Sequence, residues 1–203
     1  MKAHQFSSRR GQAAVGALTV LATLLLAACS GSGGGSTASS PPASTAAGPA
    51  APSSATAITV RSPAFAAGTM IPVRFSCRGS NTPIPLAWTG VPAGASSVAL
   101  IMDDPDAPSG TFTHWVVFNL PTTSRGITGG RLPAGAAQAQ NGRGQAAYTG
   151  PCPPSGTHHY RFTVYAEPRR LPLQAGASLP QALAAIRANP LASGRLTGLF
   201  ASG

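Results

Sequence analysis

The chain has 203 residues, a formal net charge of +10 and only 9% charged residues, four of which are acidic. This length allows one domain of ordinary size. The arginines after residue 10 are spread from Arg61 to Arg195 with one adjacent pair, Arg169-Arg170, so the sequence lacks the basic run or face typical of nucleic-acid binding. We therefore expect no nucleic-acid partner.

Residues 1–28 have the pattern of a secretory signal peptide. Lys2 and Arg9-Arg10 form a basic start, and an apolar stretch too short for a membrane span follows. The run Leu26-Ala27-Ala28-Cys29 resembles the lipobox of bacterial lipoproteins. This resemblance implies that Cys29 is lipidated and anchors the chain on the extracytoplasmic face of the cell membrane. A fully secreted chain with an unpaired Cys29 is the alternative.

Residues 29–57 are predicted to form a linker between the anchor and a folded domain at 58–203. From Ser30 to Ala57 the chain contains only Ser, Gly, Ala, Thr and Pro. Such a segment buries too little apolar surface to fold. As a flexible tether it would have an r.m.s. reach of about 30 Å. The linker would therefore hold the domain away from the membrane.

The domain is predicted to be mainly β. Short runs rich in β-branched and aromatic residues are separated by Gly and Pro, which favours an antiparallel fold with long loops. The expected strands are Ile58–Val60, Met70–Cys77, Leu86–Thr89, Ser97–Met102, His114–Leu120 and Tyr160–Ala166.

One helix is predicted near the C-terminus. Ser178 with Gln181 three residues later has the pattern of a capping box, and Asn189-Pro190 ends the helical periodicity. The apolar run Leu191–Phe200 is expected to be a second short element that packs back on the sheet.

Cys77 and Cys152 are expected to form a disulfide. If Cys29 is lipidated, these two cysteines remain as an even pair in an oxidising compartment. Closing a loop of about 75 residues would stabilise the fold by roughly 4 kcal/mol in the chain-entropy description. Two free thiols are the alternative.

Three of the four acidic residues fall within the run Asp103-Asp104-Pro105-Asp106-Ala107-Pro108. The prolines make this backbone stiff and either extended or turning. In an extended segment Asp104 and Asp106 would lie on one face, with Asp103 behind them. Neighbouring carboxylates are typical of pockets with perturbed pKa values. A charged turn at the end of the preceding strand is the alternative.

Three histidines follow the signal peptide. His114 begins an apolar strand and is expected to face a cleft. His158 and His159 are adjacent, so on a strand they point to opposite faces, and an inward His158 would bring Tyr160 to its face. The proline-rich run Gly150–Gly156 is expected to form a stiff pocket wall.

Four blocks together resemble the phosphatidylethanolamine-binding protein (PEBP) family, in particular its bacterial branch, often called Raf kinase inhibitor-like proteins. They occur in the family's order and spacing and cover about residues 58–200. The blocks are Asp104-Pro105-Asp106-Ala107-Pro108, Thr113-His114-Trp115-Val116, Gly150-Pro151-Cys152-Pro153-Pro154 and His158-His159-Tyr160-Arg161-Phe162.

The resemblance implies a PEBP-like fold with a large central antiparallel sheet, a smaller second sheet and one or two short C-terminal helices. It also implies a small pocket for phosphate-type anions or phospholipid headgroups, without a metal or cofactor. The pocket residues that carry over by position are Asp104, Asp106, His114, Gly150, Pro151, His158 and Tyr160. The chain departs from the family's bacterial pattern at Pro83-Ile84-Pro85 and at Gly142, which affects the pocket rim more than the fold.

These observations predict a membrane-anchored binding protein that is not an enzyme. Imidazolium groups of His114 and His158, the Tyr160 hydroxyl and backbone N–H groups would hold the anion, with Asp104 and Asp106 orienting them or accepting from an amine. The carboxylates would raise the pKa values of the histidines, so anion binding would strengthen as the pH falls.

Two other classes of function stay open. The domain would be an inhibitor or scaffold if its pocket regulates binding to an unknown protein partner. A hydrolase or metal-binding enzyme is less supported, because the sequence shows no nucleophile elbow, no HExxH motif and no Ser-His-Asp set.

Overall fold

The computed structural model describes residues 57–203. The predicted signal peptide, Cys29 and the predicted linker up to residue 56 lie outside the described residues. None of the helices within 57–203 has the length and apolar character needed to cross a membrane.

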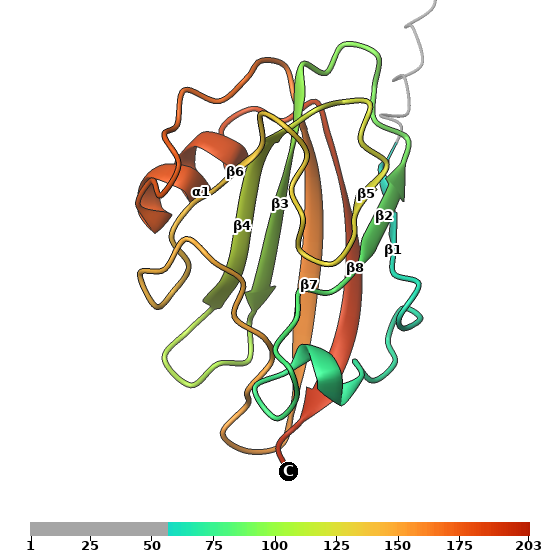
Figure 1. Cartoon of the computed structure of the whole chain (residues 1–203), viewed down its shortest axis with the longest axis vertical. Coiled ribbons are helices and arrows are strands. Elements are labelled where there is room, and N and C mark those ends of the chain that lie inside the picture. Colours follow the sequence, from blue (N-terminus) through green and yellow to red (C-terminus); the bar gives the residue numbers. More distant parts are fainter. Residues whose placement is uncertain (1–56) are drawn as a thin grey trace, which may run out of the picture. The chain divides into compact units, whose positions relative to one another are not determined.

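The structure has two antiparallel sheets, a short helix and a 3-10 turn (Figure 1). The larger sheet has the strand order β6-β4-β3-β7-β8 and the smaller one the order β1-β2-β5. The strands of the larger sheet are β3 (Ser97–Asp104), β4 (Phe112–Leu120), β6 (Ala137–Gln138), β7 (Thr157–Glu167) and β8 (Ala192–Ala201). The remaining elements are β1 (Thr59–Arg61), η1 (Val73–Phe75), β2 (Leu86–Thr89), β5 (Gly126–Ile127) and α1 (Leu179–Arg187).

Both faces of the larger sheet are covered, which explains why every residue of β3 is buried. Because side chains alternate along a strand, Leu100 and Met102 pack toward the smaller sheet, in one core cluster with Trp88. Ala99 and Ile101 belong to the cluster on the opposite face, where α1 lies. Figure 1 shows α1 on one side of the larger sheet and β1, β2 and β5 on the other. The predicted fold class is therefore confirmed.

Helix α1 forms where it was predicted, but its predicted capping box does not. Ala182 and Ile186, four residues apart, are buried against the sheet. In a capping box the serine hydroxyl accepts a backbone N–H of the first helical turn. Here the Ser178 hydroxyl instead donates to the side chain of Gln181 at 2.9 Å and accepts no such N–H. The helix is thus held by packing of its apolar face.

The prediction of a strand at Met70–Cys77 is wrong. Pro72 lacks an N–H donor and cannot continue a ladder; the segment makes a single bridge, from Met70 to Leu199, and then turns into η1. The apolar run after α1 is strand β8, which pairs with β7 from Ala192 to Ala201. The two-residue strands β5 and β6 have no counterpart among the predicted elements.

A bulge in β4 determines where His114 points. Met102 pairs with Trp115 and Asp103 pairs with Thr113, so β4 has one extra residue, His114, at this place. Without the extra residue, His114 would point to the face opposite Trp115. The bulge turns it toward the face of the larger sheet on which Tyr160 lies, and the two rings pack edge to face at 5.2 Å.

Candidate functional site

The centre of the candidate site is a buried pair between Asp104 at the end of β3 and His158 near the start of β7. His158 Nδ1 lies 2.7 Å from Asp104 Oδ2, and the two side chains are 9% and 5% exposed. The other carboxylate oxygen of Asp104 accepts the backbone N–H of Asp106 at 2.9 Å. The pair therefore has a fixed orientation, with both Asp104 oxygens engaged.

Asp106 does not share a pocket with Asp104, contrary to the prediction. It follows β3 in a turn, so the strand alternation no longer applies, and its carboxylate accepts from the backbone N–H and the ring of His159 at 2.7 and 2.8 Å. His159 and Asp106 are exposed. These hydrogen bonds, the backbone one first, lower the pKa of Asp106. Asp106 and His159 form a separate exposed pair.

Asp103 lies on the opposite face of the larger sheet from Asp104. It pairs across the sheet with Arg161, whose guanidinium donates to both carboxylate oxygens at 2.7 and 3.0 Å. Arg187 of α1 lies 3.6 Å from the same carboxylate. Asp103 therefore joins β3, β7 and α1 and contributes to the fold.

His114 is buried and neutral at neutral pH. Its Nδ1 lies 2.8 Å from the Thr149 carbonyl. Since a carbonyl only accepts, Nδ1 carries the proton and Nε2 is an unprotonated acceptor. Burial lowers the pKa of His114, and this effect exceeds the raising effects of the bond to Thr149 and of the Asp104 charge. The Asp104 carboxylate does act to raise the pKa of this histidine, as predicted, but burial outweighs it, so the net shift is opposite to the expected one.

Tyr160 points to the same face of β7 as His158, as predicted, and is fully buried. Among residues 57–203 its hydroxyl has no hydrogen-bond partner. Burial, and secondly the nearby Asp104 charge, raise the pKa of the phenol, so it stays protonated. The O–H donor of Tyr160 therefore lies in the same buried region as His114 and Asp104.

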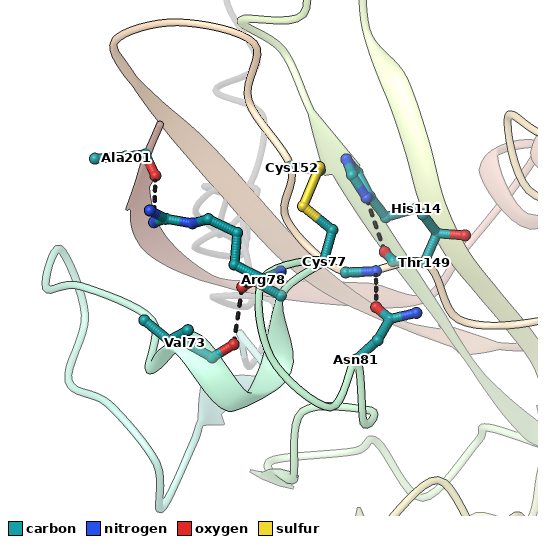
Figure 2. Close-up of a disulfide and its surroundings, with 10 residues drawn as sticks. Val73, Cys77, Arg78, Asn81, His114, Thr149, Cys152 and Ala201 are labelled. Atoms are coloured by element: carbon teal, nitrogen blue, oxygen red, sulfur yellow. Dashed lines mark hydrogen bonds between the residues drawn. A yellow bond between two sulfur atoms is a disulfide. The ribbon is translucent and has the colours of Figure 1, made fainter. Parts of the chain in front are cut away.

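The loop around Gly150, Pro151 and Cys152 forms another wall of the site and is held in place by a disulfide and two hydrogen bonds (Figure 2). Cys77 and Cys152 are joined by a disulfide, and the Cys77 N–H donates to the Pro151 carbonyl at 3.1 Å. Asn81 Oδ1 accepts the Gly150 N–H at 2.8 Å. A Cβ at Gly150 would lie 2.2 Å from a backbone oxygen, so only glycine fits there. Because the Gly150 N–H already donates to Asn81, it is not free to donate to a bound anion, as had been predicted for backbone N–H groups of the pocket.

Between these groups lies an open cavity of about 180 Å³. It takes in four of the seven predicted pocket residues: Asp104, His114, Gly150 and His158. Pro151 is buried in the wall, and Tyr160 packs behind His114. The other lining residues are Ala107, Pro108, Phe112, Arg143, Thr149, Cys152 and Pro154.

Comparison with known proteins places this arrangement in a family. The sequence profile described as "Phosphatidylethanolamine-binding protein" matches residues 61–201. The chain belongs to the phosphatidylethanolamine-binding protein family. A "UPF0098 protein" of Methanothermobacter thermautotrophicus is 48% identical over 138 residues, which are 66% of this chain and 91% of that protein. The Mycobacterium tuberculosis protein named "Putative lipoprotein LppC" is 46% identical over 149 residues, 72% of this chain and 74% of that protein.

Solved structures of PEBP relatives have the same fold. Escherichia coli YbcL, described as a new member of the mammalian PEBP family, is 32% identical with a TM-score of 0.68 and covers 72% of this chain and 99% of its own. CT736 of Chlamydia trachomatis is 33% identical with a TM-score of 0.68 and covers 73% of this chain and 99% of its own. The predicted family is confirmed.

Sequence reasoning missed Phe112, Thr149 and the one arginine at the site of this PEBP, Arg143. It is exposed at the cavity rim, in a turn where its backbone N–H donates to Asn141 Oδ1 at 2.8 Å. Its positive charge helps to lower the pKa of His114. A single arginine in a loop has no sequence pattern that would identify it as a binding residue. The only sequence feature that pointed to this loop was Gly142, which departs from the family's bacterial pattern.

The site offers no evident metal centre. Across residues 57–203 there is no group of three or more His, Cys, Asp or Glu side chains placed to hold a metal ion. The groups around the cavity are instead a mixture of one carboxylate, two imidazoles and one guanidinium. Such a set is suited to an ionic organic ligand with both donors and acceptors.

Proposed function

We propose that this PEBP is a membrane-anchored extracytoplasmic binding protein that takes a small phosphate-type anion or phospholipid headgroup in the cavity beside Asp104, His114 and His158. One observation carries the proposal. Within residues 57–203, His114 Nε2 and the Tyr160 hydroxyl are two of the four buried side-chain polar atoms without a partner, and they belong to rings in contact. Unpaired buried polar groups are costly and are rare away from functional sites.

The charges around the cavity favour a ligand that has both signs. Arg143 at the rim suits phosphate oxygens. The neutral His114 accepts through Nε2, so it suits a ligand N–H or O–H, such as an ammonium group or a protonated phosphate oxygen. A phosphoethanolamine headgroup has both kinds of group.

The proposed membrane anchor rests on separate support. The run ending at Cys29 has the lipobox pattern, and a relative that is 46% identical has the name "Putative lipoprotein LppC". An anchored domain would meet headgroups at high local concentration. Mass spectrometry of the mature N-terminus tests the anchor independently of the pocket.

Calorimetric titration of the full-length chain with phosphate and with phosphoethanolamine tests the pocket. The variants Asp104→Ala and His114→Ala are expected to lose about tenfold or more in affinity, because each removes a group at the cavity. Asp106→Ala and His159→Ala are matched controls: they remove the same residue types from the exposed pair and should bind like the wild type. Folding of each variant is checked by circular dichroism.

Two results would contradict the proposal. If a folded wild-type chain binds neither compound, the pocket is not a phosphate or headgroup site, and a protein partner becomes the better explanation of the domain. Equal losses in the Asp104→Ala and Asp106→Ala variants would show that the ligand does not use the cavity.

The pH dependence of anion binding should reflect the lowered pKa of His114. Sulfate is the suitable probe, because its charge does not change between mildly acidic and neutral pH. Its binding is expected to strengthen by about tenfold as the pH falls, since a protonated His114 gains a donor at Nε2. The midpoint should lie below the ordinary histidine value of 6.5, because burial favours the neutral ring.

His158, Asp104 and Arg143 also face the cavity, so the profile must be assigned by substitution. In His114→Gln, the gain at low pH should shrink, whereas His159→Gln should leave the profile unchanged. A pKa above 6.5 for His114 in the free chain, read from its ring proton resonances by NMR, would show that the charge of Asp104 outweighs burial at His114, contrary to the expectation.

A further inference from the structure

A second hollow adjoins the cavity on the other side of Arg143. Its volume is about 280 Å³, and it shares Arg143, Thr149 and Cys152 with the cavity as common wall. The remaining residues of this second hollow are Cys77, Asn81, Gln145 and Tyr148. The two spaces therefore form one bipartite depression with Arg143 on the shared rim.

The second hollow is lined by neutral polar groups. Asn81 uses its Oδ1 to accept from Gly150, and no hydrogen bond within residues 57–203 involves its Nδ2 or the exposed side-chain amide of Gln145. The Tyr148 hydroxyl donates to the Phe75 carbonyl at 2.7 Å and keeps its acceptor capacity. Amide and hydroxyl groups without a carboxylate suit ligand hydroxyls better than a cation.

The charge of Arg143 is not neutralised by the protein. All four acidic side chains of the chain lie in the described part. Asp103 pairs with Arg161, Asp104 with His158, and Asp106 with His159. Glu167 lines a different cavity, bounded by the end of α1. The guanidinium forms no ion pair within residues 57–203 and can therefore meet phosphate oxygens with its planar set of donors.

We propose that the bipartite depression selects polyol phosphates: the phosphate lies against Arg143 at the mouth of the cavity, and neighbouring hydroxyls occupy the second hollow beside Asn81 and Gln145. This inference rests on the proposed phosphate-binding function and specifies its ligand. Glycerol and inositol phosphate esters have the required chemistry, either as free esters or as lipid headgroups. Arg143 is then a specificity-determining residue.

The experiment compares glycerol phosphate with propyl phosphate, which has the same carbon chain without hydroxyls, by calorimetry on the full-length chain. Wild type should bind glycerol phosphate about tenfold more tightly, because the hydroxyls gain hydrogen bonds in the second hollow. Gln145→Ala should remove most of this preference while leaving propyl phosphate unaffected. Arg143→Gln should weaken both esters by about tenfold. Arg131→Gln, which removes an exposed arginine outside both hollows, should change neither.

The outcomes separate the two proposals. If inorganic phosphate binds in a manner sensitive to His114→Ala but the two esters bind equally, the polyol inference is overturned and phosphate binding stands. If no phosphate compound binds, both are overturned. Sedimentation of a Cys29→Ala variant, which lacks the proposed anchor, with phosphatidylcholine vesicles identifies the source. Binding that requires added phosphatidylinositol and is lost in Arg143→Gln assigns a lipid headgroup, and binding of soluble esters alone assigns free polyol phosphates.

Discussion

Glu167→Gln is expected to stabilise the folded chain by about 3 kcal/mol at mildly alkaline pH. Glu167 is 2% exposed, its Oε1 has no hydrogen-bond partner in the described part of the chain, and burial raises the pKa of the carboxyl from 4.5 to about 7. Above that pH the folded state holds an unpaired buried charge, which glutamine removes while keeping the shape. The unfolding temperature should rise by roughly 5–10 °C.

The sign of the pH dependence follows from proton binding. Between 4.5 and about 7 the folded protein holds a proton on Glu167 that the unfolded chain has released. The free energy of unfolding should therefore fall as the pH rises through this window, and it should do so less in Glu167→Gln. Urea unfolding at a series of pH values measures this directly. Asp106→Asn is the charge-matched control, because it removes an exposed carboxylate whose pKa is lowered. A Glu167→Gln variant no more stable than the wild type at alkaline pH would contradict the expectation.

Removing the disulfide is expected to have an equally large effect in the opposite direction. The double variant Cys77→Ser, Cys152→Ser should lose about 4 kcal/mol of stability, because the bond closes a loop across a sequence separation of 75. Cys152 also lines the cavity, and it directly follows Gly150 and Pro151, which are hydrogen-bonded to Asn81 and Cys77. Phosphate affinity should therefore decrease together with stability.

Urea unfolding and phosphate titration, each with and without a reducing agent, measure both effects. Reduced wild type should behave like the double variant, and the double variant should be insensitive to the reducing agent. If phosphate affinity is unchanged in a double variant that is clearly less stable, then the loop is held by the side chain of Asn81 and the backbone N–H of residue 77 alone, and the disulfide does not support the cavity.

Strand alternation predicted the parts of the site that depend on local geometry. His158 and Tyr160 lie on one face of β7 and His159 on the other, as expected from the period of two. The same rule failed at Asp106, because β3 ends at Asp104 and the chain turns there. A charged turn, the alternative considered from the sequence, describes Asp106 correctly, while Asp104 is a buried member of the cavity.

Other features depend on contacts between segments far apart in the sequence. The orientation of His114 follows from a bulge that exists only in the pairing of β4 with β3. Its lowered pKa follows from burial, which the neighbouring sequence does not reveal. Gly150 is required because the segment around Phe75 and Asn81 approaches it closely. These tertiary contacts explain why the sequence identified four residues that line the cavity but not their protonation or their donors.

The cavity groups Asp104, His114 and His158 come from β3, β4 and β7, which are adjacent in the larger sheet. Hydrogen-bonded ladders fix the separation of neighbouring strands, so these three groups are held as a unit. Arg143 and Gln145, in contrast, belong to an exposed loop whose turn is formed by the side chain of Asn141. Substitutions at positions 143 and 145 are therefore expected to alter the proposed ligand preference while the sheet and its buried pair stay unchanged.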